Sequence, residues 1–241
     1  MERTRAEEAP IFDFTAADGI RHTGWRINAK DVEAVRKAFE GVPILYIADG
    51  HHRAAAAARS CEQVQGAGES GRTLAVIFPS SQLKILAYNR VVKDLNGLSN
   101  EQFLAEVAKV GEVTENTSAV PQGPGEVSFF LEWKWYGLRF RERHQENPIE
   151  ALDVSLLQNQ VLKPFLGIEN PRTDKRIDFV GGIRGTAELE RRVNAGEAIA
   201  FSMYPTSLEQ LMDVADANGI MPPKSTWFEP KLRDGLFTHR I

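Results

Sequence analysis

Residues 46–53 read Tyr-Ile-Ala-Asp-Gly-His-His-Arg and carry the strongest local signal in the chain. The apolar run from Pro43 to Ala48 predicts a buried strand that ends abruptly at Asp49-Gly50. The alanine-rich segment from Arg53 to Cys61 predicts a helix. Because glycine allows a sharp backbone turn, the stretch predicts a strand, a glycine turn and a helix start.

This turn is a candidate anion site. A helix N-terminus presents unpaired N–H groups and the positive end of the helix dipole. His51, His52 and Arg53 add side-chain donors there, and arginine binds phosphate through paired hydrogen bonds. We therefore predict that Asp49, Gly50 and these three residues bind nucleotide phosphates. An ordinary capped turn without a ligand is the alternative.

A metal site is a second alternative for the same residues. Asp49, His51 and His52 are all accepted metal ligands. Adjacent histidines at a helix start point in different directions, so one ion would rarely bind both. We therefore assign no metal ligands.

Two other segments bring polar groups. Residues 221–226 read Met-Pro-Pro-Lys-Ser-Thr, in which a lysine stands beside two hydroxyls as in phosphate loops, although the glycine-rich pattern is missing. A rigid proline connector with a surface lysine is the competing interpretation. Tyr88-Asn89-Arg90 ends a predicted strand and places polar groups where they would reach the same cleft.

Bulk properties exclude several classes of protein. The 241 residues have a net charge of −4, which argues against general nucleic-acid binding. Cys61 is the single cysteine, so an internal disulfide and multi-cysteine zinc sites are excluded. No apolar run approaches the length of a membrane span, and the first eight residues are too charged for a secretory signal. These features predict a cytoplasmic protein that does not associate with membranes.

Helices and strands mix along the chain. Helices are predicted from Asn28, from the capping boxes Ser99–Gln102 and Thr206–Glu209, from Asp153 towards Pro164, and over 186–194. Further strands are predicted over 73–78, 83–88, 127–131, 135–140, 176–180 and 198–203. Because short hairpins accompany the helices, the predicted fold class is α+β, with mixed sheets and flanking helices.

Four motifs occur in order: residues 46–53, 88–92 (Tyr-Asn-Arg-Val-Val), 176–182 (Arg-Ile-Asp-Phe-Val-Gly-Gly) and 221–226. Together they resemble a prokaryotic family, the domain of unknown function numbered one thousand and fifteen, from about Pro10 to the C-terminus. That family looks like the free serine kinases. The resemblance implies a ParB/sulfiredoxin-like core around the Asp-Gly-His-His-Arg turn.

The resemblance also implies an activity. It suggests transfer of phosphate from ATP or ADP to the hydroxyl of L-serine, with Mg²⁺ accompanying the nucleotide. By motif, Asp49, Gly50, His51, His52 and Arg53 become phosphate or substrate contacts, and Lys224, Ser225 and Thr226 become phosphate contacts. Tyr88, Asn89 and Arg90 are assigned to the substrate. The implied organisation is a polar lead (1–10), a nucleotide-phosphate region (11–115) and a C-terminal α+β region (126–241).

The chain departs from the family pattern in two respects. Family members carry a long N-terminal segment, so we expect a missing N-terminal partner segment. The kinases use an upstream glutamate as base; Glu33 is the nearest option here, and the base is left unassigned. A nucleotide-binding sensor or switch without catalysis is therefore the alternative function. A sulfiredoxin-like redox enzyme is discounted because His51 stands where that chemistry needs cysteine.

Overall fold

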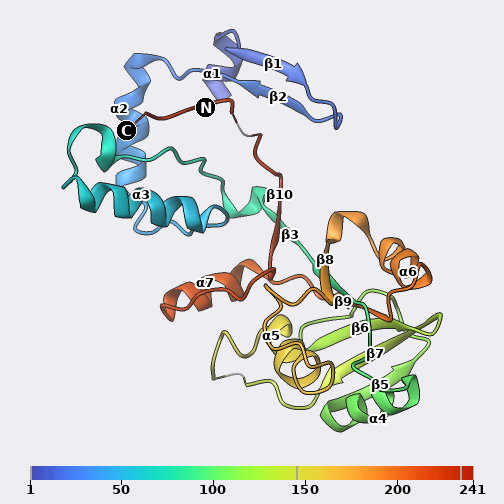
Figure 1. The fold of residues 1–241 in the computed structure, drawn as a ribbon. Coiled ribbons are helices and arrows are strands. Elements are labelled where there is room, and N and C mark those ends of the chain that lie inside the picture. The colour runs from blue at the N-terminus through green and yellow to red at the C-terminus, as the bar shows by residue number, and fades with distance from the viewer. Residues whose placement is uncertain (1, 145, 234, 241) are drawn as a thin grey trace. The chain divides into compact units, whose positions relative to one another are not determined.

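The computed structural model describes residues 2–144, 146–233 and 235–240, apart from the side chain of His52. The chain divides into two compact units, residues 1–47 and residues 48–241, and each is described by itself (Figure 1). The domain boundaries expected from the sequence, 11–115 and 126–241, stay a prediction. No helix among the described residues is long and apolar enough to cross a membrane.

The first unit holds two helices and a hairpin. These are α1 (Glu2–Glu7), β1 (Phe12–Thr15), β2 (Arg21–Gly24) and α2 (Ala29–Glu40). The two strands pair antiparallel, and the carboxylate of Asp13 accepts from Arg21 Nε at 2.8 Å. Asn28 caps α2, as the sequence predicts, because its side chain accepts from the N–H of Lys30 at 3.2 Å.

The second unit is built around a six-stranded antiparallel sheet with the order β5-β7-β6-β9-β4-β8 (Figure 1). Its strands are β4 (Tyr88–Val92), β5 (Gly111–Glu115), β6 (Glu126–Leu131), β7 (Lys134–Phe140), β8 (Ile177–Gly181) and β9 (Ile199–Met203). Four of these strands confirm the predicted hairpin and the two predicted later strands. The other two differ from the prediction, because Tyr88 begins β4 instead of ending a strand, and β5 was not predicted. The fold class is therefore mixed α and β, as expected.

Helices cover both faces of this sheet. On one face, α4 (Asn100–Val110) and α5 (Asp153–Leu157), with the π-helical turn Gln158–Leu162, pack in the main hydrophobic core with Phe129. On the other face, α6 (Ala187–Asn194) packs through Leu189 against Phe130. Neighbouring residues of a strand point to opposite faces, so β6 contributes side chains to both layers. This explains why β6 lacks the alternation of apolar and polar residues that a one-sided strand shows.

A separate two-stranded sheet brings the C-terminal region beside β4. Here β3 (Lys84–Leu86) pairs antiparallel with β10 (Trp227–Glu229). Behind the pair lies a small core of Ile85, Leu211 and Phe228, in which Leu211 belongs to α7 (Leu208–Asp216). Ala48, which precedes α3 (His51–Gln63), packs against this core.

Two predicted strands are wrong. Residues 43–48 and 73–78 are apolar, but neither forms a strand in the structure. Ile44 and Leu45 are 60% and 61% exposed, and Leu74 is 54% exposed. A strand requires a hydrogen-bonding neighbour as well as apolar side chains, and the described residues supply no such neighbour to either segment.

One capping box is confirmed and one is shifted. Ser99 and Gln102 cap α4 reciprocally, as predicted. At α7 the cap is Ser207 with Gln210, one residue later than the predicted Thr206 box. The hydroxyl of Thr206 instead donates to the carbonyl of Ser225 at 3.2 Å. Because its hydroxyl is used in this tertiary hydrogen bond, Thr206 does not cap α7.

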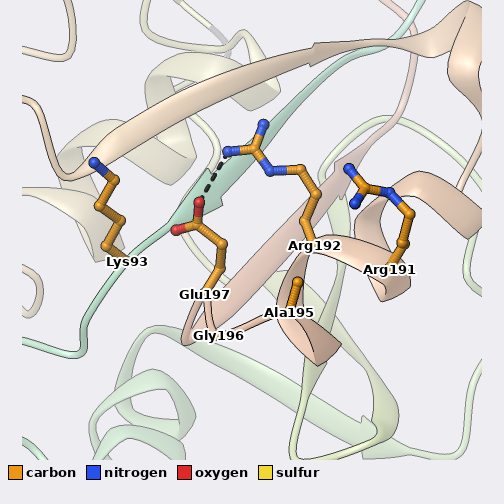
Figure 2. Close-up of a pocket in the computed structure, with 6 residues that line it drawn as sticks. All are labelled: Lys93, Arg191, Arg192, Ala195, Gly196 and Glu197. Atoms are coloured by element: carbon orange, nitrogen blue, oxygen red, sulfur yellow. Dashed lines mark hydrogen bonds and ion pairs between the residues drawn. The ribbon is translucent and has the colours of Figure 1, made fainter.

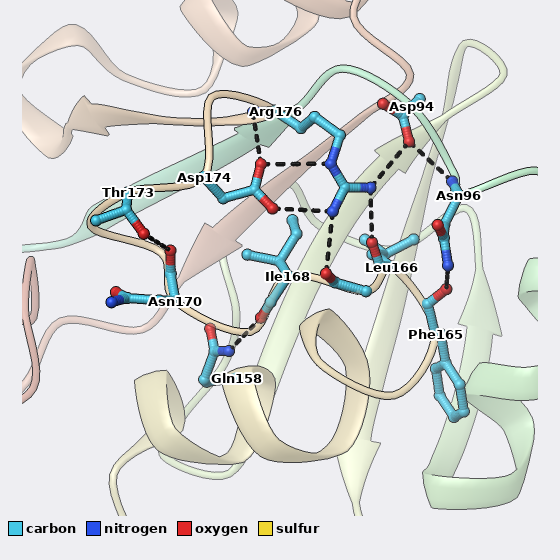
Figure 3. A network of polar contacts seen from close by, with 11 residues as sticks. Asp94, Asn96, Gln158, Phe165, Leu166, Ile168, Asn170, Thr173, Asp174 and Arg176 are labelled. Atoms are coloured by element: carbon cyan, nitrogen blue, oxygen red, sulfur yellow. Dashed lines mark hydrogen bonds and ion pairs between the residues drawn. The ribbon is translucent and has the colours of Figure 1, made fainter.

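Arg176, the first residue of the third motif, is a structural hub (Figure 3). Its guanidinium donates to the carbonyls of Leu166 and Gly167, both at 3.0 Å. It also pairs with Asp174 at 2.9 Å and with Asp94 at 3.3 Å. The motif arginine therefore fixes the loop before β8 onto the segment that follows β4.

Candidate functional site

The start of β4 meets the 221–226 loop. Lys224 Nζ lies 3.2 Å from the phenolic oxygen of Tyr88 and 5.2 Å from the centroid of its ring. The carbonyl of Lys224 accepts from Arg90 Nη2 at 3.1 Å. Two segments that the sequence singled out separately are thus joined through both the side chain and the backbone of Lys224. We refer to Tyr88, Arg90 and Lys224 as the cationic corner.

The backbone of Lys224 has a left-handed conformation, with φ of +57°. This region favours glycine and costs other residues roughly 1–2 kcal/mol. Strained backbone of this kind clusters at functional sites. Lys224 thus stands at a position where glycine would be easier to accommodate, and its side chain is exposed.

The rest of the loop is held internally. Ser225 is only 4% exposed, and its hydroxyl donates to the carbonyl of Pro222 at 2.5 Å. Its own carbonyl accepts from Thr206. Thr226 is half-buried directly before β10. Ser225 therefore shapes the turn that presents Lys224.

Asn89 is buried between two strands. Its side-chain oxygen accepts from the backbone N–H of Met203 at 3.0 Å. This bond continues the pairing of β4 with β9 beyond its last backbone partner, Arg90 with Phe201. The geometry gives Asn89 a role in positioning the start of β4.

Arg90 places a cation in the interior. It is 4% exposed, and burial lowers the pKa of its guanidinium to about 10, so the group stays charged at neutral pH. It donates to the carbonyls of Tyr88 and Lys224, and its Cζ lies 5.7 Å from the ring centroid of Phe179. Among the described residues, no carboxylate lies within ion-pair distance of Arg90.

A cavity of about 220 Å³ adjoins Arg90. Apolar and polar side chains both line it. They are Arg90, Val154, Ser155, Gln158, Asn159, Leu162, Pro171, Phe179, Pro222 and Pro223. The cavity therefore lies between α5 with its following π-helical turn, β4 and β8, and the loop that carries Lys224.

The Asp-Gly-His-His-Arg turn begins α3. Gly50 has a φ of +85° and donates its N–H to its neighbour Asp49 at 2.8 Å. A Cβ atom placed on Gly50 would lie 3.3 Å from Nη2 of Arg53, so the guanidinium folds back over the turn. His51 is exposed, whereas the side chain of His52 lies outside the described residues. The alternative metal site at this turn is therefore untested.

The C-terminal strand connects this turn to the cationic corner. Lys231 Nζ lies 3.6 Å from the carboxylate of Asp49 and 5.1 Å from the ring centroid of Trp227. The Trp227 ring in turn contacts Tyr88 edge-on, with centroids 5.4 Å apart. The 49–53 turn, among the described residues, does not line the 220 Å³ cavity. The sequence analysis did not include Trp227 and Lys231 in the site. Their position shortly after the 221–226 motif is the feature of the sequence that could have indicated them.

Glu33, the nearest option for the base, forms an exposed ion pair within α2. Arg36 donates to both of its carboxylate oxygens, at 2.7 and 3.0 Å. These hydrogen bonds lower the pKa of Glu33, which makes the carboxylate a weaker base. The catalytic base stays unassigned.

A second cavity of about 340 Å³ lies at the end of α6 (Figure 2). Three cations line it: Lys93, Arg191 and Arg192. Arg192 pairs with Glu197 at 2.9 Å and with Asp178 at 2.6 Å, and Arg191 pairs with Glu188 at 2.7 Å. Both guanidinium groups are neutralised by carboxylates, so this cavity is a weaker candidate for an anion than the one at Arg90.

Comparison with protein families identifies the chain. The family model described as "Protein of unknown function (DUF1015)" matches residues 1–155. The chain belongs to this family. The first two of the four motifs lie within the matched range, and the DUF1015 protein carries the other two, at 176–182 and 221–226, beyond it.

Solved structures give a looser likeness. One is a free serine kinase in complex with AMP, at 18% identity and a TM-score of 0.45, covering 84% of this chain and 81% of that one. Another is a conserved hypothetical protein from Pyrococcus furiosus, at 16% identity and a TM-score of 0.44, covering 84% of both chains. No curated protein matches.

Proposed function

We propose that this DUF1015 protein is a phosphotransferase resembling the free serine kinases, which transfers phosphate from ATP or ADP to the hydroxyl of L-serine or a similar small alcohol. The cationic corner is the observation that carries the proposal. Lys224 contacts Tyr88 and Arg90, which lie far from it in sequence. The family motifs led us to expect these residues at one site.

The charges suit phosphoryl transfer, in which positioning and electrostatic stabilisation do most of the work. The exposed ammonium of Lys224 and the donors of the 49–53 turn would hold the nucleotide phosphates. The Tyr88, Trp227 and Lys231 side chains connect these two groups of donors. Arg90 lies deeper, and we assign it to the acceptor.

Mg²⁺ would arrive with the nucleotide. This ion prefers oxygen ligands and commonly uses one or two carboxylates together with substrate phosphates. Asp49 is the carboxylate at the turn. One of its oxygens accepts from the N–H of Gly50 at 2.8 Å, and the other lies 3.6 Å from Lys231 Nζ. The donor set therefore fits an ion held mainly by phosphate, which would neutralise charge on the transferred group.

The test is direct. The purified chain is incubated with L-serine, Mg²⁺ and either ATP or ADP, and O-phosphoserine is measured by mass spectrometry. We expect product with one of the donors and a loss of at least tenfold in Lys224→Ala. Absence of product with both donors, in a preparation that binds nucleotide, would reject the kinase assignment.

A sensor or switch that binds nucleotide without turnover is the second candidate. This function needs phosphate donors such as the exposed ammonium of Lys224, but it needs no catalytic base, and none is assigned. In that case Arg53→Ala would weaken nucleotide binding while the unmodified chain would show no turnover. A chain that forms O-phosphoserine would exclude this candidate.

A further inference from the structure

Arg90 carries a positive charge that no carboxylate among the described residues compensates. Its described partners are two carbonyl oxygens and an aromatic ring. A buried charge is costly without an opposite charge beside it. Among the described residues that line the cavity at Arg90, none is acidic, so the cavity offers room for an anionic ligand beside the guanidinium.

The guanidinium is also fixed in place. A guanidinium group carries five N–H donors, of which the contacts to Tyr88 and Lys224 use two. These contacts hold the plane of the group, so the remaining donors are offered in a fixed orientation. Planar carboxylates match such donors through two parallel hydrogen bonds.

The polar wall of the cavity presents acceptors. Ser155 donates its hydroxyl hydrogen to the carbonyl of Ile149 at 2.6 Å. Gln158 donates its amide to the carbonyl of Ile168 at 2.7 Å (Figure 3). Each side chain keeps an oxygen with lone pairs for a ligand N–H or O–H. The wall therefore favours a ligand that has a donor group as well as a carboxylate.

The volume limits the ligand to a small molecule. Pockets for drug-sized ligands measure roughly 300–1,000 Å³. The cavity of about 220 Å³ is smaller than that range, so it cannot enclose a nucleotide. Pro222 and Pro223, which line it, immediately precede Lys224 in the chain. A molecule in the cavity would thus lie next to the loop that presents the ammonium.

We propose that the cavity beside Arg90 is a binding site for the carboxylate of a small amino acid or hydroxy acid. The guanidinium binds the carboxylate, and the oxygens of Ser155 and Gln158 accept from the amino or hydroxyl group. The further statement that this ligand is the phosphate acceptor rests on the proposed phosphotransferase function. The proposal that the cavity binds the carboxylate does not depend on the phosphotransferase function.

Binding is measured by isothermal titration calorimetry without nucleotide. The probes are L-serine, glycerate, ethanolamine and inorganic phosphate, used with the unmodified chain. L-serine or glycerate is expected to bind at least tenfold more tightly than ethanolamine, which has no carboxylate. Inorganic phosphate is expected not to displace the bound carboxylate at equal concentration.

Arg90 is buried, so its replacement tests folding as well as binding. Asn159 is exposed at the cavity wall and offers a cleaner variant. Asn159→Asp adds a negative charge near the bound carboxylate, and we expect affinity to fall about threefold or more. Asn159→Lys is expected to raise it. Asn100→Asp, at the start of α4, adds the same charge away from the cavity lining and serves as the control.

Several results would overturn the proposal. It is wrong if neither carboxylate probe binds, if ethanolamine binds as tightly as L-serine, or if phosphate displaces the carboxylate on equal terms. It is also wrong if both Asn159 variants bind as the control does. Carboxylate binding without O-phosphoserine formation would reject the kinase function alone. O-phosphoserine formation with a KM unchanged by Asn159→Asp would reject the cavity as the acceptor site.

Discussion

Lys224 and Tyr88 are 136 residues apart in the chain, yet the ammonium of one lies 3.2 Å from the phenolic oxygen of the other. The pairing of β3 with β10 produces this contact, because β10 begins three residues after Lys224 and β3 ends two residues before Tyr88. Register between two short strands thus sets the geometry of the candidate site.

A double-mutant cycle measures this contact. Tyr88→Phe removes the phenolic oxygen, and Lys224→Met removes the ammonium with little change in side-chain length. Because the pair is exposed to solvent, we expect a coupling free energy in unfolding of only about 0.5–1 kcal/mol. In nucleotide binding, Lys224→Met should have the larger effect of the two. Equal effects of the two single variants on nucleotide affinity would contradict a phosphate role for the ammonium.

The left-handed backbone at Lys224 predicts an unusual stability order. Lys224→Gly and Lys224→Ala both remove the ammonium, so both should lose activity. Glycine accepts a φ of +57° without a Cβ penalty, and we expect Lys224→Gly to be more stable than Lys224→Ala by about 1 kcal/mol. Chemical denaturation measures the difference. An alanine variant as stable as the glycine variant would show that the loop relaxes to another conformation.

Asp153 predicts a pH dependence. Burial raises the pKa of its carboxyl group from 3.8 to about 6. The hydrogen bond of 2.6 Å from the N–H of Gly125 acts in the opposite direction, but its effect on the pKa is smaller. The native state then binds a proton more tightly than the unfolded state. The contribution of Asp153 to the free energy of unfolding is therefore complete below pH 4 and is lost as the pH rises through about 6. Between those values the loss amounts to roughly 2–3 kcal/mol.

Asp153→Asn isolates that contribution. Asparagine keeps an oxygen that can accept from Gly125 and does not ionise. Relative to the unmodified chain, the variant should therefore gain stability on going from pH 4 to pH 7 by about the same 2–3 kcal/mol. Urea denaturation at the two pH values gives this difference. Parallel stability curves for the two proteins would place the pKa of Asp153 near its ordinary value.

Arg176 predicts a contrast between two arginines. Arg176→Gln breaks bonds to the carbonyls of Leu166 and Gly167 and an ion pair with Asp174, and should cost about 1–3 kcal/mol in unfolding free energy. Arg191→Gln removes an exposed ion pair within one helix and should have no measurable effect. Thermal unfolding compares them. Equal melting temperatures would show that the Arg176 hub adds nothing to stability.

Local sequence predicted most of the second unit correctly. The hairpin of β6 and β7 follows from two apolar runs with a short connection, and α4 follows from the Ser99 and Gln102 box. The same reasoning failed for 43–48 and 73–78. Apolar composition indicates that a segment favours burial, but strand formation depends on a neighbour that local sequence does not reveal.

At the candidate site, motif identity and tertiary geometry made different contributions. The types of residue at 49–53, 88–90 and 224–226 led us to predict a site for anions, because charge and donor chemistry belong to the side chains themselves. Only the fold decided which of them are exposed donors, as Lys224 is. It also decided which are buried and hydrogen-bonded within the protein, as Ser225 and Asn89 are. The uncompensated charge of Arg90 and its cavity were likewise invisible in the sequence, because burial arises from segments that are brought together from distant parts of the chain.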